Sequence, residues 1–322
     1  MNVQVTNDDS ITAIDWKGTI IMAVSLVLLS AANCWIVQFP FPIYKIFSGD
    51  SRVWNSIPYL DRAIESDPYN WKNYYQRGRA YEKFRYYQLA LNDYDKTAKL
   101  NPDNVHNIEH RACVQYYAGN FLKALADRNW VMSARGACSE DYADRSRILE
   151  QLNKSDSALT DARTAVYLKP SSAGAHLALA YACLRINNLQ EALHECRMAQ
   201  VLSPADSRFA AKLCEAQVLI AQEQWSQSIN LCNEALKQNP DGWNALWIKA
   251  LAQYNLGEYN QAVRNATASI CLNPMQATPY LIRAESHNKL NRYIDAAKDR
   301  NTAKKLDANL EHLRDICNRV IP

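Results

Sequence analysis

Glycine is scarce in this chain, with 8 residues among 322. A sequence with few glycines and many alanine, leucine, glutamine, lysine and arginine residues favours helices over sheets. Charged residues make up 21% of the chain and hydrophobic residues 48%. Those fractions are typical of a globular protein and argue against a disordered one.

An excess of charge of one sign is also lacking. The 36 basic residues nearly balance the 33 acidic ones, which leaves a net charge of +3. The basic residues form no run with interleaved aromatic residues. We therefore do not expect a nucleic acid as a partner.

Closely spaced cysteines and common catalytic motifs are missing as well. The nine cysteines are odd in number, and no two of them form a C-x-x-C pair. Scattered single cysteines are typical of small buried side chains in a reducing compartment. The sequence has no glycine-rich phosphate loop and no G-x-S-x-G motif. These features predict no disulfide framework, no metal, no cofactor and no small-molecule substrate.

One long uncharged run is present. Residues 18–37, GTIIMAVSLVLLSAANCWIV, contain 20 residues and no charge. A helix of this length can cross a hydrocarbon core of about 30 Å. Trp16, Trp35 and Phe39 lie at its ends, where interfacial aromatic residues are common. The sequence therefore predicts an N-terminal tail at 1–17, a transmembrane helix at 18–37 and a proline-containing linker at 38–50.

Two alternatives to an uncleaved membrane anchor stay open. A signal peptide could be cut near residues 30–32, although the chain begins with three acidic residues against one lysine. A lipid attached to Cys34 is the other alternative. Lys45 and Arg52 follow the apolar run closely, and the positive-inside bias therefore favours a cytoplasmic C-terminal domain. A periplasmic or lipid-tethered protein that assists envelope assembly is the corresponding alternative function.

Prolines recur with a period of about 34 residues. Pro68, Pro102, Pro170, Pro204, Pro240 and Pro274 are separated by 34, 68, 34, 36 and 34 residues. When this proline is numbered position 32 of a repeat, positions 8, 20 and 27 are small in nearly every unit. Position 20 holds Ala90, Ala124, Ala158, Ala192, Ser228, Ala262 and Ala296. Position 17 is bulky in most units. Small residues at fixed positions indicate where two helices cross closely.

This pattern resembles the tetratricopeptide-repeat (TPR) family over residues 71–308, as seven units in phase. The resemblance implies an all-α fold, with two antiparallel helices per unit stacked into a right-handed superhelical solenoid. One helix pair cannot bury its own apolar stripe, so the units must share a continuous core. The ends then need caps, which we expect at residues 51–70 and 309–322.

Charged residues also repeat in phase. Position 7 is basic in five units, and position 23 is Asp or Asn in the same units. The pairs are Arg77 with Asp93, Arg111 with Asp127, Arg145 with Asp161, Lys249 with Asn265, and Arg283 with Asp299. This co-occurrence predicts a ladder of contacts between the two helices of a unit.

The resemblance places ligands along the first helix of each unit, on the concave face. In repeats 1–3 this face is charged and aromatic. Its candidate binding residues are Tyr75, Arg79, His106, Glu109, His110 and Arg147.

In repeats 4–7 the same face is apolar. Its candidate residues are Leu177, Tyr181, Leu184, Leu213, Ile220, Trp247, Ile248, Leu251, Tyr254, Leu281 and Ile282. We predict a groove here for an apolar segment of a partner, with Trp247 and Tyr254 as anchors. The alternative is that superhelical curvature or self-association buries these side chains.

One short motif matches an enzyme. Residues 106–110, HNIEH, fit the inverted zinc-peptidase signature H-x-x-E-H. A zinc site would need a third ligand and a substrate cleft, and the motif falls on a repeat helix. The sequence therefore predicts a membrane-anchored scaffold that binds a protein or peptide, with no catalytic residue and no metal. A zinc metallopeptidase is the alternative that this motif leaves open.

Overall fold

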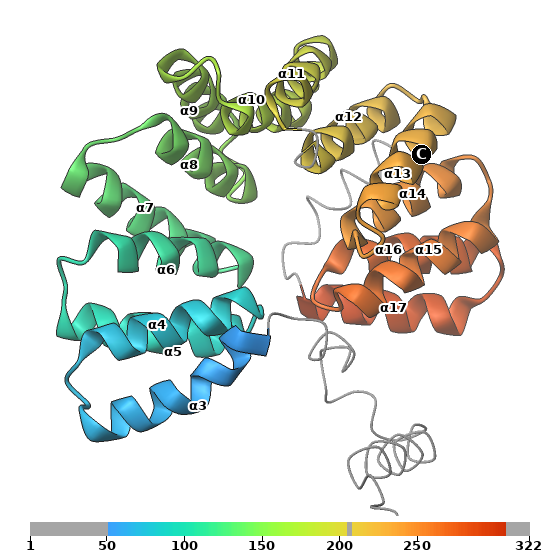
Figure 1. Ribbon diagram of the computed structural model, residues 1–322. Helices are drawn as coiled ribbons and strands as arrows, with labels where there is room; N and C mark the ends of the chain where they lie inside the picture. Colours follow the sequence, from blue (N-terminus) through green and yellow to red (C-terminus); the bar gives the residue numbers. More distant parts are fainter. Residues whose placement is uncertain (1–50, 205–207, 307–322) are drawn as a thin grey trace, which may run out of the picture. The chain divides into compact units, whose positions relative to one another are not determined.

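The computed structural model describes residues 51–204 and 208–306 (Figure 1). These residues form fifteen α-helices joined by short turns, and the predicted all-α fold is confirmed. The helices are α3 (Ser51–Ser66), α4 (Trp71–Lys83), α5 (Tyr87–Leu100), α6 (Val105–Tyr117), α7 (Phe121–Arg135), α8 (Ser139–Gln151), α9 (Ser155–Leu168), α10 (Ala173–Arg185), α11 (Leu189–Leu202), α12 (Phe209–Ala221), α13 (Trp225–Gln238), α14 (Trp243–Asn255), α15 (Tyr259–Leu272), α16 (Ala277–Lys289) and α17 (Tyr293–Leu306).

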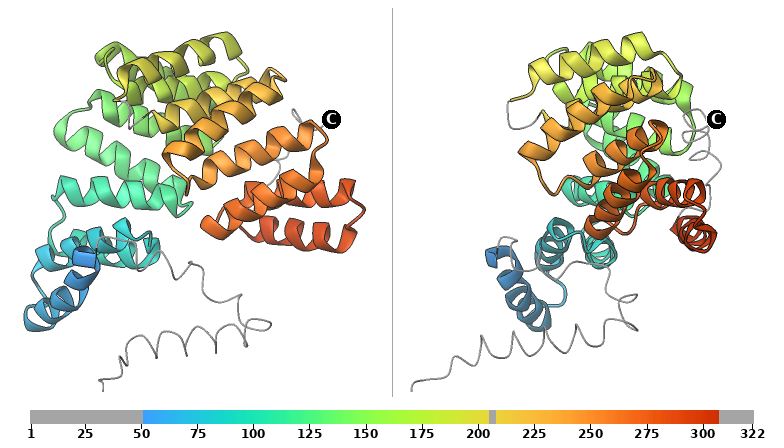
Figure 2. Two further views of the ribbon diagram at one scale, coloured as in Figure 1. Left: turned by 45° about the vertical axis from the view of Figure 1, so that its right-hand side comes forward. Right: turned by 90° about the vertical axis from the view of Figure 1, so that its right-hand side faces the viewer.

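Helices α4 to α17 pair as seven hairpins, which we number repeats 1 to 7. The first helix of each repeat is even-numbered, and the second is odd-numbered. The closest packing joins the two helices of one hairpin, and each second helix also packs on the next first helix. Neighbouring first helices touch as well, as α8 does with α10 and α14 with α16. Figure 2 shows the same succession of hairpins from two further sides. The predicted repeat architecture is therefore confirmed.

Side-chain hydroxyls show how closely the two helices of a hairpin cross. Ser146 at position 8 donates to the carbonyl of Ala158 at position 20, at 2.8 Å. Ser228 at position 20 donates to the carbonyl of Ala216 at position 8, at 2.9 Å. The small residues predicted at these positions therefore lie against the partner helix backbone. In repeat 1 the position is Gly78, where an added Cβ would lie 2.8 Å from the ring of Tyr94.

The turn inside every hairpin contains one residue with a left-handed backbone, always at position 15. These residues are Arg85, Gly119, Asn153, Asn187, Glu223, Gly257 and Asn291, with φ between 56° and 79°. Glycine and asparagine adopt this conformation readily, whereas other L-residues do so at a cost. Arg85 and Glu223 also adopt it, although their side chains disfavour it. The packing of the hairpin, rather than the residue type, therefore determines this turn geometry.

The charged ladder is present in repeats 1, 2, 3 and 7, and in each of them it is bidentate. Arg77 Nε and Nη2 donate to the two carboxylate oxygens of Asp93, at 2.9 and 2.7 Å. Arg111, Arg145 and Arg283 bind Asp127, Asp161 and Asp299 in the same way. Repeat 6 differs from the prediction, because Asn265 donates to Gln253 instead.

Each ladder arginine also reaches back to the preceding unit. Its free Nη1 donates to the residue at position 25 of the second helix before it. The acceptors are Asp61 for Arg77, Asp95 for Arg111, Asn129 for Arg145 and Thr267 for Arg283, at 2.7 to 3.1 Å. One guanidinium thus fixes its own hairpin and joins it to its neighbour. Asp61 lies in α3, which therefore occupies the place of a second helix before repeat 1.

The ladder changes in repeats 4 and 5. In repeat 4 position 23 is Glu195, and its buried carboxylate bonds to Nδ1 of His176. At the next junction the charges are exchanged. Arg197 at position 25 donates to Glu215 at position 7 of repeat 5, at 3.3 Å. The same two positions are therefore linked with the opposite polarity.

Several predicted segments lie outside the described residues. They are the tail at 1–17, the apolar run at 18–37, the linker at 38–50 and the C-terminal cap at 309–322. Within the described ranges, no helix combines the length and the apolar character needed to cross a membrane.

Candidate functional site

The first helices of repeats 1–3 carry a connected set of polar and aromatic side chains. Glu82 is central in repeat 1, because its Oε2 accepts hydrogen bonds from the hydroxyl of Tyr94 and from His110 Nδ1, the latter at 2.9 Å. The ring of Tyr75 packs against both Tyr94 and His110. Burial and the bond to Glu82 raise the pKa of Tyr94, so its phenol is a neutral donor. Two of the predicted residues, Tyr75 and His110, thus belong to one cluster.

A second cluster centres on Glu109 of α6. Its carboxylate binds Arg135 at 2.7 Å and Nδ1 of His106 at 3.0 Å. Burial alone would raise the pKa of Glu109, but the bonds from Arg135 and His106 lower it below its ordinary value. The structure therefore brings His106 and Glu109 together and adds Arg135, which the sequence had not indicated.

The contact between α7 and α8 has a buried arginine at its centre. Arg128 donates to Asp141 at 3.2 Å and to Asp144 at 2.9 Å. Arg128 as a whole is only 5% exposed. Asp141 also accepts from Arg135 and from the backbone of Cys138. At the same position five other repeats carry Tyr94, Ala162, Cys196, Cys232 and Ala266, whereas repeat 7 carries Arg300, which is 49% exposed. An arginine at this position therefore does not by itself distinguish a buried polar contact from an exposed one.

Glu150 at the end of α8 is a second buried acid of this helix. It is 8% exposed, and its Oε1 is buried with no hydrogen-bond partner. Burial raises the pKa of Glu150 to about 8, although Arg147 and Arg185 act in the opposite direction. Burial raises the pKa of Tyr116, and the carboxyl of Glu150 adds to that rise. Arg147, a predicted site residue, is half-buried beside Glu150 and lies 3.6 Å from Asp144.

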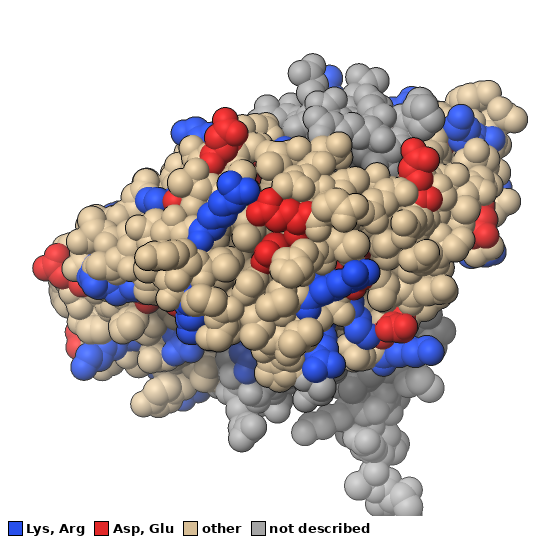
Figure 3. All heavy atoms as spheres, turned by 90° about the horizontal axis from the view of Figure 1, so that it is seen from above, with Lys and Arg blue, Asp and Glu red and all other residues tan. Residues whose placement is uncertain are grey.

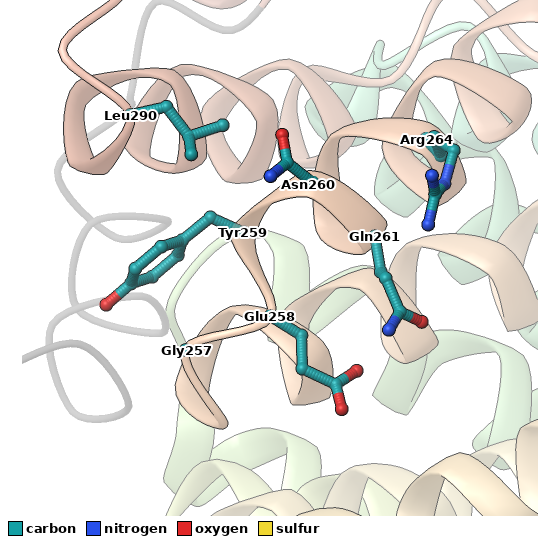
Figure 4. A pocket seen from close by; sticks show the side chains of 7 residues that line it. All are labelled: Gly257, Glu258, Tyr259, Asn260, Gln261, Arg264 and Leu290. Carbon is teal, nitrogen blue, oxygen red and sulfur yellow. The ribbon is translucent and has the colours of Figure 1, made fainter.

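A pocket of about 280 Å³ opens at the start of this face. It is lined by Trp71, Lys72, Tyr75, Gln76, Asn104 and His106. Two predicted residues from different repeats, Tyr75 and His106, therefore share one depression. A larger hollow of about 450 Å³ lies elsewhere, around the α14–α15 turn and Leu290 (Figure 4). Its side chains, which include Glu258 and Arg264, are mostly exposed, and Gln261 accepts a hydrogen bond from the buried amide of Gln253 at 2.7 Å.

The structure corrects the prediction of an apolar groove in repeats 4–7. Seven of the eleven predicted residues are less than 9% exposed: Leu213, Ile220, Ile248, Leu251, Tyr254, Leu281 and Ile282. Leu213, Ile220, Ile248, Leu251 and Ile282 share one core cluster that runs through repeats 5–7. Neighbouring first helices pack on one another here, so the apolar stripe faces another helix rather than solvent.

The other four predicted apolar residues are half-buried. Leu177, Tyr181 and Leu184 pack against the core cluster of repeats 3–5, and Trp247 packs against the next cluster. Of the eleven, these four keep the larger solvent-accessible surfaces. Burial raises the pKa of Tyr181 well above its ordinary value.

The H-x-x-E-H motif forms no metal cage in the structure. His106 is largely exposed and bonds to Glu109, whereas His110 bonds to Glu82 of the neighbouring helix. In the part of the chain that the structure describes, no three His, Cys, Asp or Glu side chains converge as metal ligands would.

Charge of either sign is distributed without a large patch on the face seen in Figure 3. Basic and acidic side chains stand next to one another there, and uncharged residues cover most of it. This distribution agrees with the nearly balanced charge of the sequence.

Comparisons with known proteins point to one kind of repeat. Family models described as "Tetratricopeptide repeat" match residues 72–104, 144–207 and 214–264. A curated relative, the protein SGT1 homolog of Oryza sativa subsp. japonica, is 29% identical over 117 residues. That alignment covers 36% of this chain and 32% of the relative, so the chain spans about a third of that relative's length.

Solved structures share the fold at low sequence identity. A tetratricopeptide repeat protein from Parabacteroides merdae aligns with a TM-score of 0.56 and 14% identity, over 78% of this chain and 99% of the other. The APC/C hetero-tetramer Cut9–Hcn1 aligns with a TM-score of 0.57 and 13% identity, over 83% of this chain and 52% of the other. The type IV pilus biogenesis factor PilW aligns with a TM-score of 0.50 and 17% identity, over 66% of this chain and 97% of the other. The three matched stretches are therefore similar to tetratricopeptide repeats, and the solved structures share the fold of the described helices.

Proposed function

We propose that this protein is a scaffold that binds a partner protein on the first-helix face of repeats 1–3. One observation carries the proposal: charged and aromatic side chains stay accessible there, whereas seven of the eight apolar residues predicted on the same face of repeats 5–7 are buried. An accessible face with aromatic and arginine side chains has the composition of protein-binding surfaces. Tyr75, Arg79, His106, Glu109, His110 and Arg147 are its proposed contact residues.

The half-buried residues of repeats 4 and 6 extend the proposal. Leu177, Tyr181 and Leu184 lie on α10, which packs on α8, the helix of Arg147, and Trp247 lies farther on in α14. Their accessible edges suit an apolar side chain of the same partner. The seven fully buried residues are left out, because a partner could reach them only by separating packed helices.

The uncharged run at residues 18–37 supports a further part of the proposal, which is attachment to a membrane. Its length and its flanking aromatic residues suit a single-pass helix. Attachment would hold the bound partner near the membrane and raise its effective concentration there. Alkaline extraction of membranes tests this: an integral helix stays with the lipid, whereas release into the supernatant would contradict the anchor.

A photo-crosslinking residue tests the proposed face. We would place it at His106, which is exposed on α6, and at Lys123, which is exposed on the second helix α7 as the matched control. A partner captured through position 106 and not through position 123 is the expected result. Equal capture at both positions, or capture only at 123, would contradict binding on the first-helix face. Zinc content of the purified chain, before and after His106→Ala, separately tests the metallopeptidase alternative.

A further inference from the structure

Helix α4 is unusually basic for one helix of this chain. It carries Lys72, Arg77, Arg79 and Lys83 against a single acid, Glu82. Arg77 is bound to Asp93 and Asp61 in the ladder. Lys72 and Arg79 are exposed, and neither forms an ion pair with any described residue. Their charges are therefore available to a binding partner.

Two acids of the same face, Glu82 and Glu109, are already engaged. Glu82 accepts bonds from Tyr94 and His110, and Glu109 is held by Arg135 and His106. Turning either carboxylate toward Lys72 or Arg79 would break bonds to partly buried groups, which is costly. The charges of Lys72 and Arg79 are thus not neutralised by these two acids.

Aromatic rings lie beneath both cations. Lys72 Nζ is 5.9 Å from the ring centroid of Trp71, and the guanidinium carbon of Arg79 is 6.0 Å from that of Tyr75. Trp71, Lys72 and Tyr75 line the pocket of about 280 Å³ together with His106. A cation held over a ring keeps one side free for an anion, while the ring edge offers an apolar contact.

We propose that this site recognises an acidic peptide segment of the partner. An Asp or Glu carboxylate pairs with Lys72 and Arg79, and the side chain next to it enters the pocket over Trp71 and Tyr75. This inference rests on the proposed function and adds to it the chemistry of the partner. It also assigns recognition of the acidic segment to repeat 1.

Binding of defined peptides to the full-length chain tests the proposal. The probes are a fluorescent peptide of alternating glutamate and tyrosine, the same peptide with glutamine in place of glutamate, and one with lysine. The test variant is Lys72→Gln with Arg79→Gln. The matched control is Lys237→Gln with Arg264→Gln, which removes the same charge from exposed positions of α13 and α15.

The expected result is binding of the glutamate peptide alone, weakened roughly tenfold in the test variant and unchanged in the control. The inference is overturned if the glutamate peptide does not bind, if the glutamine peptide binds equally well, or if both variants weaken binding equally. Helical circular dichroism of each variant checks that the fold is intact.

The crosslinking experiment separates this inference from the proposed function. A partner captured through position 106 whose crosslinked segment is acidic supports both. A captured segment without acidic residues overturns the acidic-peptide inference and leaves the scaffold function in place. Absence of capture at position 106, with capture at 123, overturns the scaffold function on this face itself.

Discussion

The left-handed turn residue shows how a single position can store strain. Glu223 has φ of +61° although it is neither glycine nor asparagine. This conformation costs a non-glycine residue about 1 kcal/mol. Glycine avoids that cost, but its greater conformational entropy in the unfolded state offsets part of the gain in stability. We expect Glu223→Gly to stabilise the protein by roughly 0.5 kcal/mol in urea unfolding. Gln224→Gly, at the next position, which is exposed and has φ of −92°, is the matched control. Stabilisation by both substitutions would contradict the role of the turn geometry.

Glu150 should make stability depend on pH. Burial raises its pKa from an ordinary value of 4.5 to about 8, so folding favours the protonated acid. The associated stability is complete below pH 4.5 and is lost as the pH rises through 8. Glutamine resembles the protonated acid and does not titrate. Glu150→Gln should therefore gain on the order of 2 kcal/mol over wild type at pH 8 and little at pH 4.5. The same difference in the free energy of unfolding between Glu150→Gln and wild type at pH 4.5 and pH 8 would contradict this.

At the scale of helices, the joint between α7 and α8 depends on Arg128. The side chain is 6% exposed and holds two carboxylates of α8. Arg128→Met leaves the buried Asp141 with less compensation, and we expect a loss of about 3 kcal/mol in urea unfolding. Arg135→Met is the control, because Arg135 is 34% exposed and its loss should cost about 1 kcal/mol or less. Equal losses in the free energy of unfolding for Arg128→Met and Arg135→Met would show that the burial of the arginine does not determine how much it stabilises the protein.

How far the sequence predicted the structure also becomes clear at this scale. The period and the small positions followed from proline and alanine spacing, because close helix crossings tolerate few side chains. The turn at position 15 has a sequence signal in the five units that carry glycine or asparagine there, but Arg85 and Glu223 carry no local signal for a left-handed backbone. The apolar groove failed for another reason. An apolar stripe has the same spacing whether it faces solvent or a neighbouring helix, as Ile248 and Ile282 demonstrate.

At the scale of the whole chain, the stability of each repeat should depend mainly on the repeats next to it. Units in a repeat protein contact only their neighbours, and destabilisation therefore spreads over a limited range. Ile248 is fully buried in the cluster of repeats 5–7. Ile248→Ala should cost about 3 kcal/mol there. Hydrogen exchange should then lose protection in repeats 5–7 and keep it in repeats 1 and 2. Loss of protection to the same extent in every repeat would instead indicate a single cooperative unit.

The exchanged charges between Arg197 and Glu215 restrict how this chain could gain or lose repeats. Removal of repeat 4 would bring Arg163, at position 25 of repeat 3, to Glu215, and an ion pair could form again. Removal of repeat 5 would instead bring Lys249, at position 7 of repeat 6, to Arg197, and two cations would meet. The repeats are therefore not interchangeable parts. A shortened descendant of this protein, natural or designed, could omit the fourth unit far more easily than the fifth.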